Sequence, residues 1–364
     1  MIKHSINIHR GCFGGCAFCT ISAHQGKFIN SRSERSILAE VEKVTKMPDF
    51  KGYLSDVGAP SANMYLMGGK NKEACRKCRR PSCLHPKLCP NLDNNHRPLL
   101  ALYEKIRAVK GIKKAFIGSG IRYDLFDDSP YFETVVKHHT SGRLKVAPEH
   151  TEERVLKLMR KPSFSMFEDM HRRFQQICRR EGLKYQLIPY FISSHPGCEE
   201  RDMQALADKV LGRLHFNLEQ VQDLTPTPMT LSSVMFYTGI NPYTGEEVYV
   251  ARTQEDKRRQ KSYFFGGTLP EESSFFTSIG HPFPAVCIRT STERPEALDK
   301  GCFVLAGIDE KSLGQAVELA VDMTLEGDNG IVVPDYKEQN VSTKVVKIIQ
   351  SYTSVVDKMV WRKY

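Results

Sequence analysis

Hydrophobic and polar positions alternate along the first 225 residues in a way that predicts short strands separated by helices. Six runs are rich in apolar and β-branched residues, a composition typical of strands. Between them, apolar residues recur at helical spacing, as at Ile37, Val41 and Val44. The predicted strands are Lys3–Ile8, Gly52–Asp56, Lys114–Ile117, Leu144–Ala147, Tyr185–Ile192 and Leu218–Asp223.

The predicted helices end and begin at residues that favour helix termini. The helices over 99–110 and 165–181 are followed by Gly111 and Gly182, where a left-handed stop is expected. Asp128 precedes Pro130 and is predicted to cap a helix that runs through Val136. Cys178 falls on the apolar side of the helix over 165–181 and is predicted to be helix core.

Strands that alternate with helices pair in parallel, so the pattern predicts an α/β fold. Both a six-stranded open barrel and a doubly wound sheet fit, and in either the ligand site lies at the carboxyl ends of the strands. Residues 226–265 are predicted to be irregular, apart from 256–261, which is predicted to be a solvated helix face. Further on, strands are predicted at 286–289 and 303–305, and helices at 313–324 and 342–358.

Charge and cysteine content change sharply near residue 266. Residues 1–266 hold 42 basic and 28 acidic residues, a net of +14, whereas 267–364 hold 10 and 14, a net of −4. Nine of the eleven cysteines precede residue 200. No apolar run could span a bilayer and the chain starts without a secretion signal, so a cytoplasmic protein with no membrane partner is expected. The cysteines then indicate metal or catalytic use rather than disulfides.

The strongest chemical signal is the loop Gly11–Cys19, directly after the first predicted strand. Cys12, Cys16 and Cys19 have the spacing C-x3-C-x2-C. Three thiolates can hold one face of an iron–sulfur cluster and leave one iron open for a reactant. A zinc knuckle or a loop of free thiols is the alternative.

With Phe18 before the last cysteine, this loop resembles the cluster loop of the radical S-adenosylmethionine (SAM) enzymes. Longer matches make the first 265 residues similar to the YgiQ-type subfamily, whose amino-terminal domain is expected to be missing and whose carboxyl-terminal extension is expected to be cut short. The matching segments are 5–12, 22–27, 56–65, 120–124, 144–152 and 187–197.

The resemblance implies a partial (β/α)6 radical SAM barrel. It implies that Cys12, Cys16 and Cys19 bind a [4Fe–4S] cluster, and that SAM binds the open iron. Reductive cleavage of SAM would then give a 5′-deoxyadenosyl radical that abstracts hydrogen from an unknown substrate, with a flavodoxin or ferredoxin as reductant.

The resemblance also indicates residues that would contact the cofactor. Gly58 stands where the family has a glycine-rich stretch, although Ala59 departs from that pattern. Arg122 would pair with the SAM carboxylate, or else form a buried ion pair. Polar residues at strand ends are either cofactor contacts or helix caps. The predicted cofactor-binding residues are Phe18, Gly58, Arg122, Lys145, Glu149, Ser193 and His195, with His150 and Ser194 beside them.

A second set of cysteines lies within 15 residues: Cys75, Cys78, Cys83 and Cys89. Such density in a chain without a secretion signal indicates a metal site. An auxiliary iron–sulfur cluster, a structural zinc site and uncoordinated thiols are the three interpretations.

From Gly267 the sequence resembles the non-hydrolysing UDP-N-acetylglucosamine 2-epimerases instead. The resemblance implies an incomplete Rossmann-like fragment in which Ser273 and Ser274 face phosphate, and Arg294 and Glu296 face the nucleotide. The family's acid and base residues have no counterpart here, so an inactive remnant is the alternative.

Three parts are therefore predicted: a radical SAM core at 1–225, a truncated extension at 226–266 and an epimerase-like fragment at 267–364. Their direct junction indicates a fusion, natural or artificial. Two other functions stay open: a zinc-stabilised nucleic-acid-binding module, which the positive charge of 1–266 suggests, and a non-functional fusion.

Overall fold

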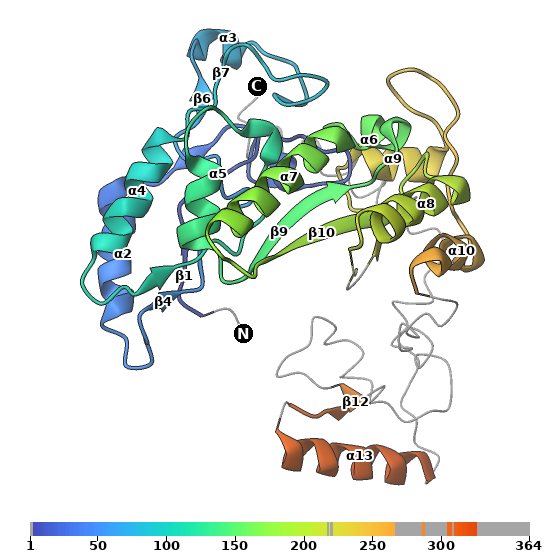
Figure 1. Ribbon diagram of the computed structural model, residues 1–364. Helices are drawn as coiled ribbons and strands as arrows, with labels where there is room; N and C mark the ends of the chain where they lie inside the picture. The colour runs from blue at the N-terminus through green and yellow to red at the C-terminus, as the bar shows by residue number, and fades with distance from the viewer. Residues whose placement is uncertain are drawn as a thin grey trace, which may run out of the picture. The chain divides into compact units, whose positions relative to one another are not determined.

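The computed structural model describes residues 3–216, 218, 221–265, 286–287, 304–307 and 309–325. The chain divides into two compact units, residues 1–267 and 268–364. The first unit holds the strands and helices predicted before residue 226 (Figure 1).

The first unit is built on parallel strands. All six predicted strands are found, and their pairing is parallel as expected. They form three groups: β1 (Ser5–Asn7) with β5 (Asp56–Gly58), β4 (Tyr53–Leu54) with β8 (Lys114–Ala115), and β9 (Arg143–Glu149) with β10 (Gln186–Ser193) and β11 (Gln222–Asp223). The fold is therefore α/β, while closure into a (β/α)6 barrel stays a prediction.

Helices between the strands bury the apolar stripes that the sequence shows. On α2, for example, Ile37, Val41 and Val44 lie in the core with Ile6 and Leu54 from the strands. The helices of this layer are α2 (Glu34–Thr45), α4 (Arg97–Ala108), α5 (Tyr131–Thr134) with the π-helix η2 (Val135–His139), α6 (Glu153–Met159), α7 (Phe164–Arg180), and α8 (Glu200–Ala207) with the π-helix η3 (Asp208–Arg213).

Most of the expected helix ends are confirmed. Gly111 and Gly182 have φ of +98° and +64°, as a left-handed stop requires. Cys178 is buried on α7. The predicted cap at Asp128 is wrong: the N-cap of the helix that begins at Tyr131 is Pro130, and no side chain caps it.

The β9–β10 pair contains a β-bulge just before the end of β9. Val146 lies opposite Pro189, but Glu149 lies opposite Phe191, so β9 holds one residue more than its partner here. Because side chains alternate between faces, the extra residue changes the face to which the last residues of β9 point. Glu149 is buried, whereas Lys145 before the bulge is exposed.

Shorter elements extend the first unit around the strand ends. They are β2 (His9–Arg10), α1 (Ile21–His24), β3 (Asn30–Ser31), β6 (Gly68–Gly69), α3 (Lys72–Arg76), β7 (Leu92–Asp93) and the 3-10 helix η1 (Tyr123–Leu125). Figure 1 shows α3, β6 and β7 projecting together from one end of this unit.

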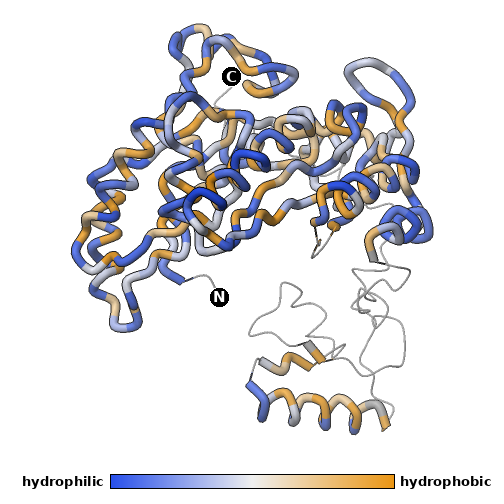
Figure 2. Tube along the Cα trace, viewed as in Figure 1, coloured by the Kyte–Doolittle hydropathy of each residue, from blue (hydrophilic) through white to orange (hydrophobic). Residues whose placement is uncertain are grey.

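The prediction for 226–265 is partly wrong: the helix expected at 256–261 is found, but a helix also forms at 231–238, where an irregular segment was expected. This segment contains α9 (Leu231–Thr238) and α10 (Gln254–Phe265). Figure 2 shows α10 to be largely hydrophilic, which is why no apolar period indicated it. Its expected solvated face is also partly wrong, because Gln260 and Lys261 are buried.

The second unit is described at β12 (Val286–Cys287), β13 (Val304–Leu305) and α13 (Glu310–Leu325). The two strands pair in parallel, and all three elements were predicted. The expected helix at 342–358 and the residues Ser273, Ser274, Arg294 and Glu296 lie outside the described residues. Among the described helices, none combines the length and apolar character needed to cross a membrane.

Candidate functional site

The three-cysteine loop lies between β2 and α1, where the chain leaves the strand β1. The Gly14 N–H donates to Cys12 Sγ at 3.3 Å. A Cβ added to Gly14 would lie 3.3 Å from the sulfur of Cys12 and 3.5 Å from that of Cys16. The two thiols therefore lie on the same side of Gly14, in a space that any larger residue would fill.

The thiols are shielded from water and influence one another. Burial raises the pKa of Cys12, while the nearby Arg122 opposes that rise. Burial also raises the pKa of Cys19 to about 11, with the sulfurs of Cys16 and Cys12 adding to it. Deprotonated sulfurs at these positions would need a positive partner, because a buried charge without one is costly.

Arg122 supplies that positive charge. Its Nη1 donates to Cys16 Sγ at 3.2 Å, and its Nε donates to Asp124 Oδ1 at 2.8 Å. Burial disfavours the guanidinium charge, but Asp124 and Cys16 hold the pKa of Arg122 well above its usual range. The edge of Arg122 expected to grip a SAM carboxylate is already occupied by Asp124. The ion-pair interpretation of Arg122 is therefore the one that the structure shows.

Glu149 is the predicted strand-end residue whose charge acts on the cysteines. It is 8% exposed and has a left-handed φ of +70°, which is rare for a residue with a side chain. Its carboxylate lies 3.6 Å from Nζ of the buried Lys161. Burial raises the pKa of Glu149 while Lys161 and Arg122 oppose the rise. Glu149 in turn raises the pKa of Cys19.

The end of β10 is polar but internally satisfied. Ser193 Oγ donates to Asp223 Oδ1 at 2.6 Å. The ring of His195 contacts the Pro196 carbonyl at 2.8 Å through Nδ1 and the Ser232 hydroxyl at 2.6 Å through Nε2. Both residues are fully buried. Their polar atoms are therefore already engaged in hydrogen bonds within the protein.

The three other predicted cofactor contacts lie in three different surroundings. Lys145 does not end its strand: it lies within β9 and is exposed, which removes the reason for its prediction. A Cβ on Gly58 would lie 2.3 Å from Ser119 Oγ, so this glycine makes room for a protein contact. Phe18 lies beside the site, with its ring 6.2 Å from that of His195.

His150, next to Glu149, belongs to a buried group beneath the strand ends. Its Nδ1 accepts from the Glu152 N–H, so Nε2 carries the proton and donates to Cys198 Sγ at 3.4 Å. Gln260 completes this group, because its Nε2 donates to the Cys198 carbonyl at 2.8 Å.

Sequence reasoning missed several of these residues. Gln260 also accepts from the Ser194 N–H at 2.8 Å, and Nζ of Lys261 lies 2.7 Å from Asp223 Oδ2. Helix α10 thus reaches the ends of β10 and β11. Asp124 was the most readable of the missed residues, since Arg122 and Asp124 are separated by a single residue.

The four-cysteine loop packs directly on the three-cysteine loop. Ser82 Oγ donates to the Gly14 carbonyl at 2.7 Å, and the Cys83 N–H donates to the Phe13 carbonyl at 3.1 Å. Gly15 has φ of +55°, and a Cβ there would lie 2.2 Å from the Pro81 carbonyl oxygen. The two loops therefore meet through their backbones.

The four thiols lie close enough to affect one another. Burial raises the pKa of Cys83; Lys27 opposes that rise, and Cys89, Cys78 and Cys75 add to it. Cys78 is exposed, with Nζ of Lys27 at 3.8 Å from its sulfur. Within the parts of the chain that the structure describes, no three His, Cys, Asp or Glu side chains already have metal-binding geometry.

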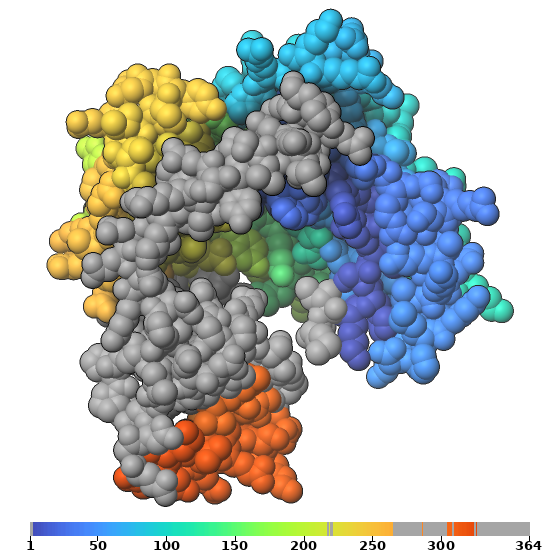
Figure 3. Space-filling view, turned by 180° about the vertical axis from the view of Figure 1, so that it is seen from behind, coloured from blue at the N-terminus to red at the C-terminus, as the bar shows by residue number. Residues whose placement is uncertain are grey.

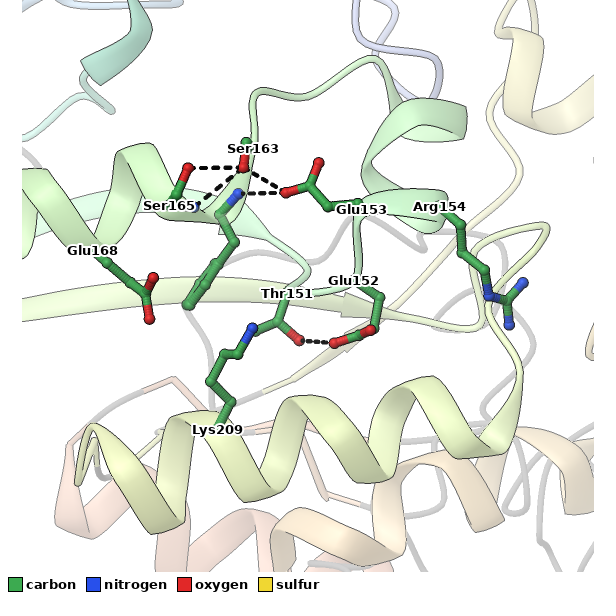
Figure 4. A pocket seen from close by; sticks show the side chains of 9 residues that line it. Thr151, Glu152, Glu153, Arg154, Ser163, Ser165, Glu168 and Lys209 are labelled. Atoms are coloured by element: carbon green, nitrogen blue, oxygen red, sulfur yellow. Dashed lines mark hydrogen bonds between the residues drawn. The ribbon is translucent and has the colours of Figure 1, made fainter.

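A cavity of about 400 Å³ lies at the other side of the β9 end, lined by the starts of α6 and α7 and by Lys209. Figure 4 shows Ser163 along its wall, hydrogen-bonded to both Glu153 and Ser165. No cysteine lines this cavity, so it is separate from the thiol loops.

Comparisons with known proteins identify close relatives of part of the chain. Residues 219–265 match a family model described as a domain of unknown function, DUF3362. A UPF0313 protein of Bacteroides thetaiotaomicron is 59% identical over 276 residues, which cover 73% of this chain and 44% of that protein. UPF0313 proteins of Porphyromonas gingivalis (59%, over 73% of this chain and 43% of that protein) and Methanocella arvoryzae (48%, over 72% and 44%) are also similar. The chain spans less than half the length of these curated relatives.

A solved structure is also similar in part. The radical S-adenosylmethionine methyltransferase TsrM of Kitasatospora setae, with cobalamin and a [4Fe–4S] cluster bound, aligns at 13% identity and a TM-score of 0.42, over 71% of this chain and 46% of that chain. A likeness this low carries no conclusion about activity. None of these comparisons supports the epimerase resemblance of residues 267–364, which stays a prediction.

Proposed function

We propose that the first unit is the core of a radical SAM enzyme that acts on an unknown substrate. The observation that carries the proposal is the three-cysteine loop itself: the sulfurs of Cys12 and Cys16 share one side of Gly14, and a buried Arg122 donates to Cys16. In this proposal Cys12, Cys16 and Cys19 hold a [4Fe–4S] cluster next to SAM. When bound, the cluster would supply the electron that cleaves SAM to a 5′-deoxyadenosyl radical.

The donor set of this loop fits such a group. Three thiols are the ligands that iron–sulfur clusters use, and Gly14 adds no side chain of its own where the sulfurs of Cys12 and Cys16 lie close to it. Arg122 would offset the negative charge of the thiolates, and Asp124 would hold its guanidinium in place. The protein's part is then to orient the cofactors and to keep water out.

Among the strand-end residues, Glu149 is the best candidate for a SAM contact. Its carboxylate is buried, its charge raises the pKa of Cys19, and Lys161 is its ion-pair partner. We keep Phe18 and Gly58 as residues that border the same space. Ser193 and His195 would support the shape of the site rather than contact SAM, because their polar atoms already have protein partners.

The four-cysteine loop would hold a second metal group. Its thiols cluster, and an auxiliary iron–sulfur cluster and a zinc ion are both consistent with four sulfur ligands. Zinc here without iron at Cys12–Cys19 would instead favour the zinc-stabilised binding module.

The test is metal analysis of the anaerobically purified chain, with iron, sulfide and zinc counted per chain. Cys16→Ala should lose about four irons and all SAM cleavage, since two thiolates cannot hold the cluster. Cys178→Ala is the matched control, because Cys178 is buried on α7 away from both loops. Equal iron content in both variants would contradict the proposal. So would a wild-type chain that binds zinc alone.

A further inference from the structure

The loop between β6 and β7 carries a dense, exposed positive charge. Residues 70–92 contain seven basic residues and one acidic residue, a net charge of +6. We call the exposed cations of this loop the basic face; they are Lys70, Lys72, Arg76, Lys77, Arg79 and Lys87. Figure 3 shows this segment as the light-blue projection of the first unit at the top of the view.

Most of the basic face has no acidic partner. Glu73 pairs with Arg76 at 3.6 Å and with Lys77 at 3.3 Å, and all three side chains are at least 60% exposed. Among the described residues, no ion pair involves the other four cations. Exposed pairs of this kind hold little energy, so the whole face is available to an anionic partner.

The loop has a fixed shape under these charges. The guanidinium of Arg80 donates to the carbonyl of Lys87 at 3.0 Å, and Lys27 binds the Arg80 carbonyl and approaches Cys78. The backbone that carries these cations is thus tied together around Arg80.

Residues 81–83 of the same loop touch the candidate cluster site. Ser82 and Cys83 bond to Gly14 and Phe13, and Pro81 abuts Gly15. A partner on the basic face would therefore bind the same segment that contacts the three-cysteine loop.

We propose that the basic face is the docking surface for an acidic one-electron carrier protein, one with a reduced flavin or iron–sulfur group. The proposal rests on the proposed function, which needs one electron at the three-cysteine loop. In this step the carrier would be oxidised by one electron, and the centre that Cys12, Cys16 and Cys19 would hold would be reduced by one. No bond forms or breaks and no proton moves.

A protein partner fits better than a nucleic acid. Single-stranded nucleic acids bind through aromatic side chains on which bases stack, and residues 70–92 contain no Phe, Tyr or Trp. Electron-carrier complexes are small, short-lived and steered by opposite charges, which a compact basic face provides.

The test compares two triple charge reversals of the anaerobically purified full chain. Lys72→Glu, Arg79→Glu and Lys87→Glu change the basic face. Lys43→Glu in the last turn of α2, with Lys46→Glu and Lys51→Glu between α2 and β4, changes net charge equally at exposed positions, at the far end of the first unit from α3 (Figure 1).

Binding of labelled, oxidised flavodoxin and the rate of electron transfer from reduced flavodoxin are both measured at low and high salt. The basic-face variant should lose about tenfold or more in association rate at low salt, and the control variant less than about twofold. High salt should remove the difference. The rate at which dithionite reduces the centre at the three-cysteine loop should be the same in the wild-type chain and in both variants.

Equal losses in both variants, or binding that does not depend on salt, would overturn the proposal. Loss of binding to a single-stranded RNA with flavodoxin binding intact would assign the face to nucleic acid instead. If dithionite gave no SAM cleavage in the wild-type chain, the proposed function would fail, whereas salt-dependent flavodoxin binding would still decide the docking surface.

Discussion

The contact between the two cysteine loops can be tested at one glycine. Replacing Gly15 by alanine places a Cβ 2.2 Å from the Pro81 carbonyl oxygen, well inside contact distance. Since the obstacle is backbone, the loops must separate. The hydrogen bonds from Ser82 Oγ to Gly14 and from the Cys83 N–H to Phe13 would then break.

The cost can be worked out from these parts. A left-handed alanine costs about 1–2 kcal/mol, and each lost hydrogen bond about 1 kcal/mol. Gly15→Ala should therefore destabilise the first unit by about 3–4 kcal/mol. Gly182→Ala is the matched control, because Gly182 has φ of +64° but no atom within 4 Å of an added Cβ. It should cost about 1–2 kcal/mol, from the backbone alone.

The assay is urea unfolding followed by amide exchange of residues 186–193, which belong to β10 and report on the first unit. Exchange of the Cys83 amide reports on the loop contact itself. Gly15→Ala should lose protection at Cys83, while Gly182→Ala should keep it. The reasoning is refuted if the two variants are equally stable and both keep the Cys83 amide protected.

Three further predictions follow from buried polar groups and a close contact. Gln260→Ala should destabilise the first unit by about 2–4 kcal/mol, because it strips a buried N–H and a buried carbonyl of their partner, whereas the exposed Arg258→Ala should change little in the same urea assay. Burial lowers the pKa of His139 to about 4, and its Nε2 has no hydrogen-bond partner. The free energy of unfolding should therefore be highest above about pH 6.5 and fall by about 3 kcal/mol as the pH drops towards 4, because the unfolded chain binds the proton first. An NMR titration in which His139 of the folded protein titrates near 6.5 would contradict this. Gly58→Ala brings a Cβ within 2.7 Å of a hydroxyl and a carboxylate and should cost about 2 kcal/mol, while Gly120→Ala, with open space, should be nearly neutral by thermal unfolding.

The strands and most helices could be predicted because each buries a continuous or periodic apolar set. In the run Leu144–Ala147, for example, the apolar residues on either side of Lys145 are typical of a strand with one buried face. The strand's true end was not predictable in the same way. Glu149 is polar, so its place in β9 depends on the ion pair with Lys161, which lies beyond α6 in the chain.

The same limit applied to α10 and to Arg122. Gln260 and Lys261 look like solvent-facing residues because they stand in the charged run 255–261, yet their partners lie on β10 and β11. The pairing of Arg122 with Asp124 is local and readable, but its approach to Cys16 joins residues 106 positions apart. Local spacing identified the three cysteines, whereas the groups that control their charge come from the tertiary fold.

Because of the bulge, the number of residues in β9 decides which side chain points inward at the end of the strand. With the extra residue present, Glu149 is buried beside Lys161; in a regular strand it would share the outward face of Lys145. Deleting one residue at Ala147 or Pro148 would therefore exchange inner and outer side chains without changing any of them. A gap of one position here, when such sequences are aligned or redesigned, amounts to replacing the carboxylate at the strand end.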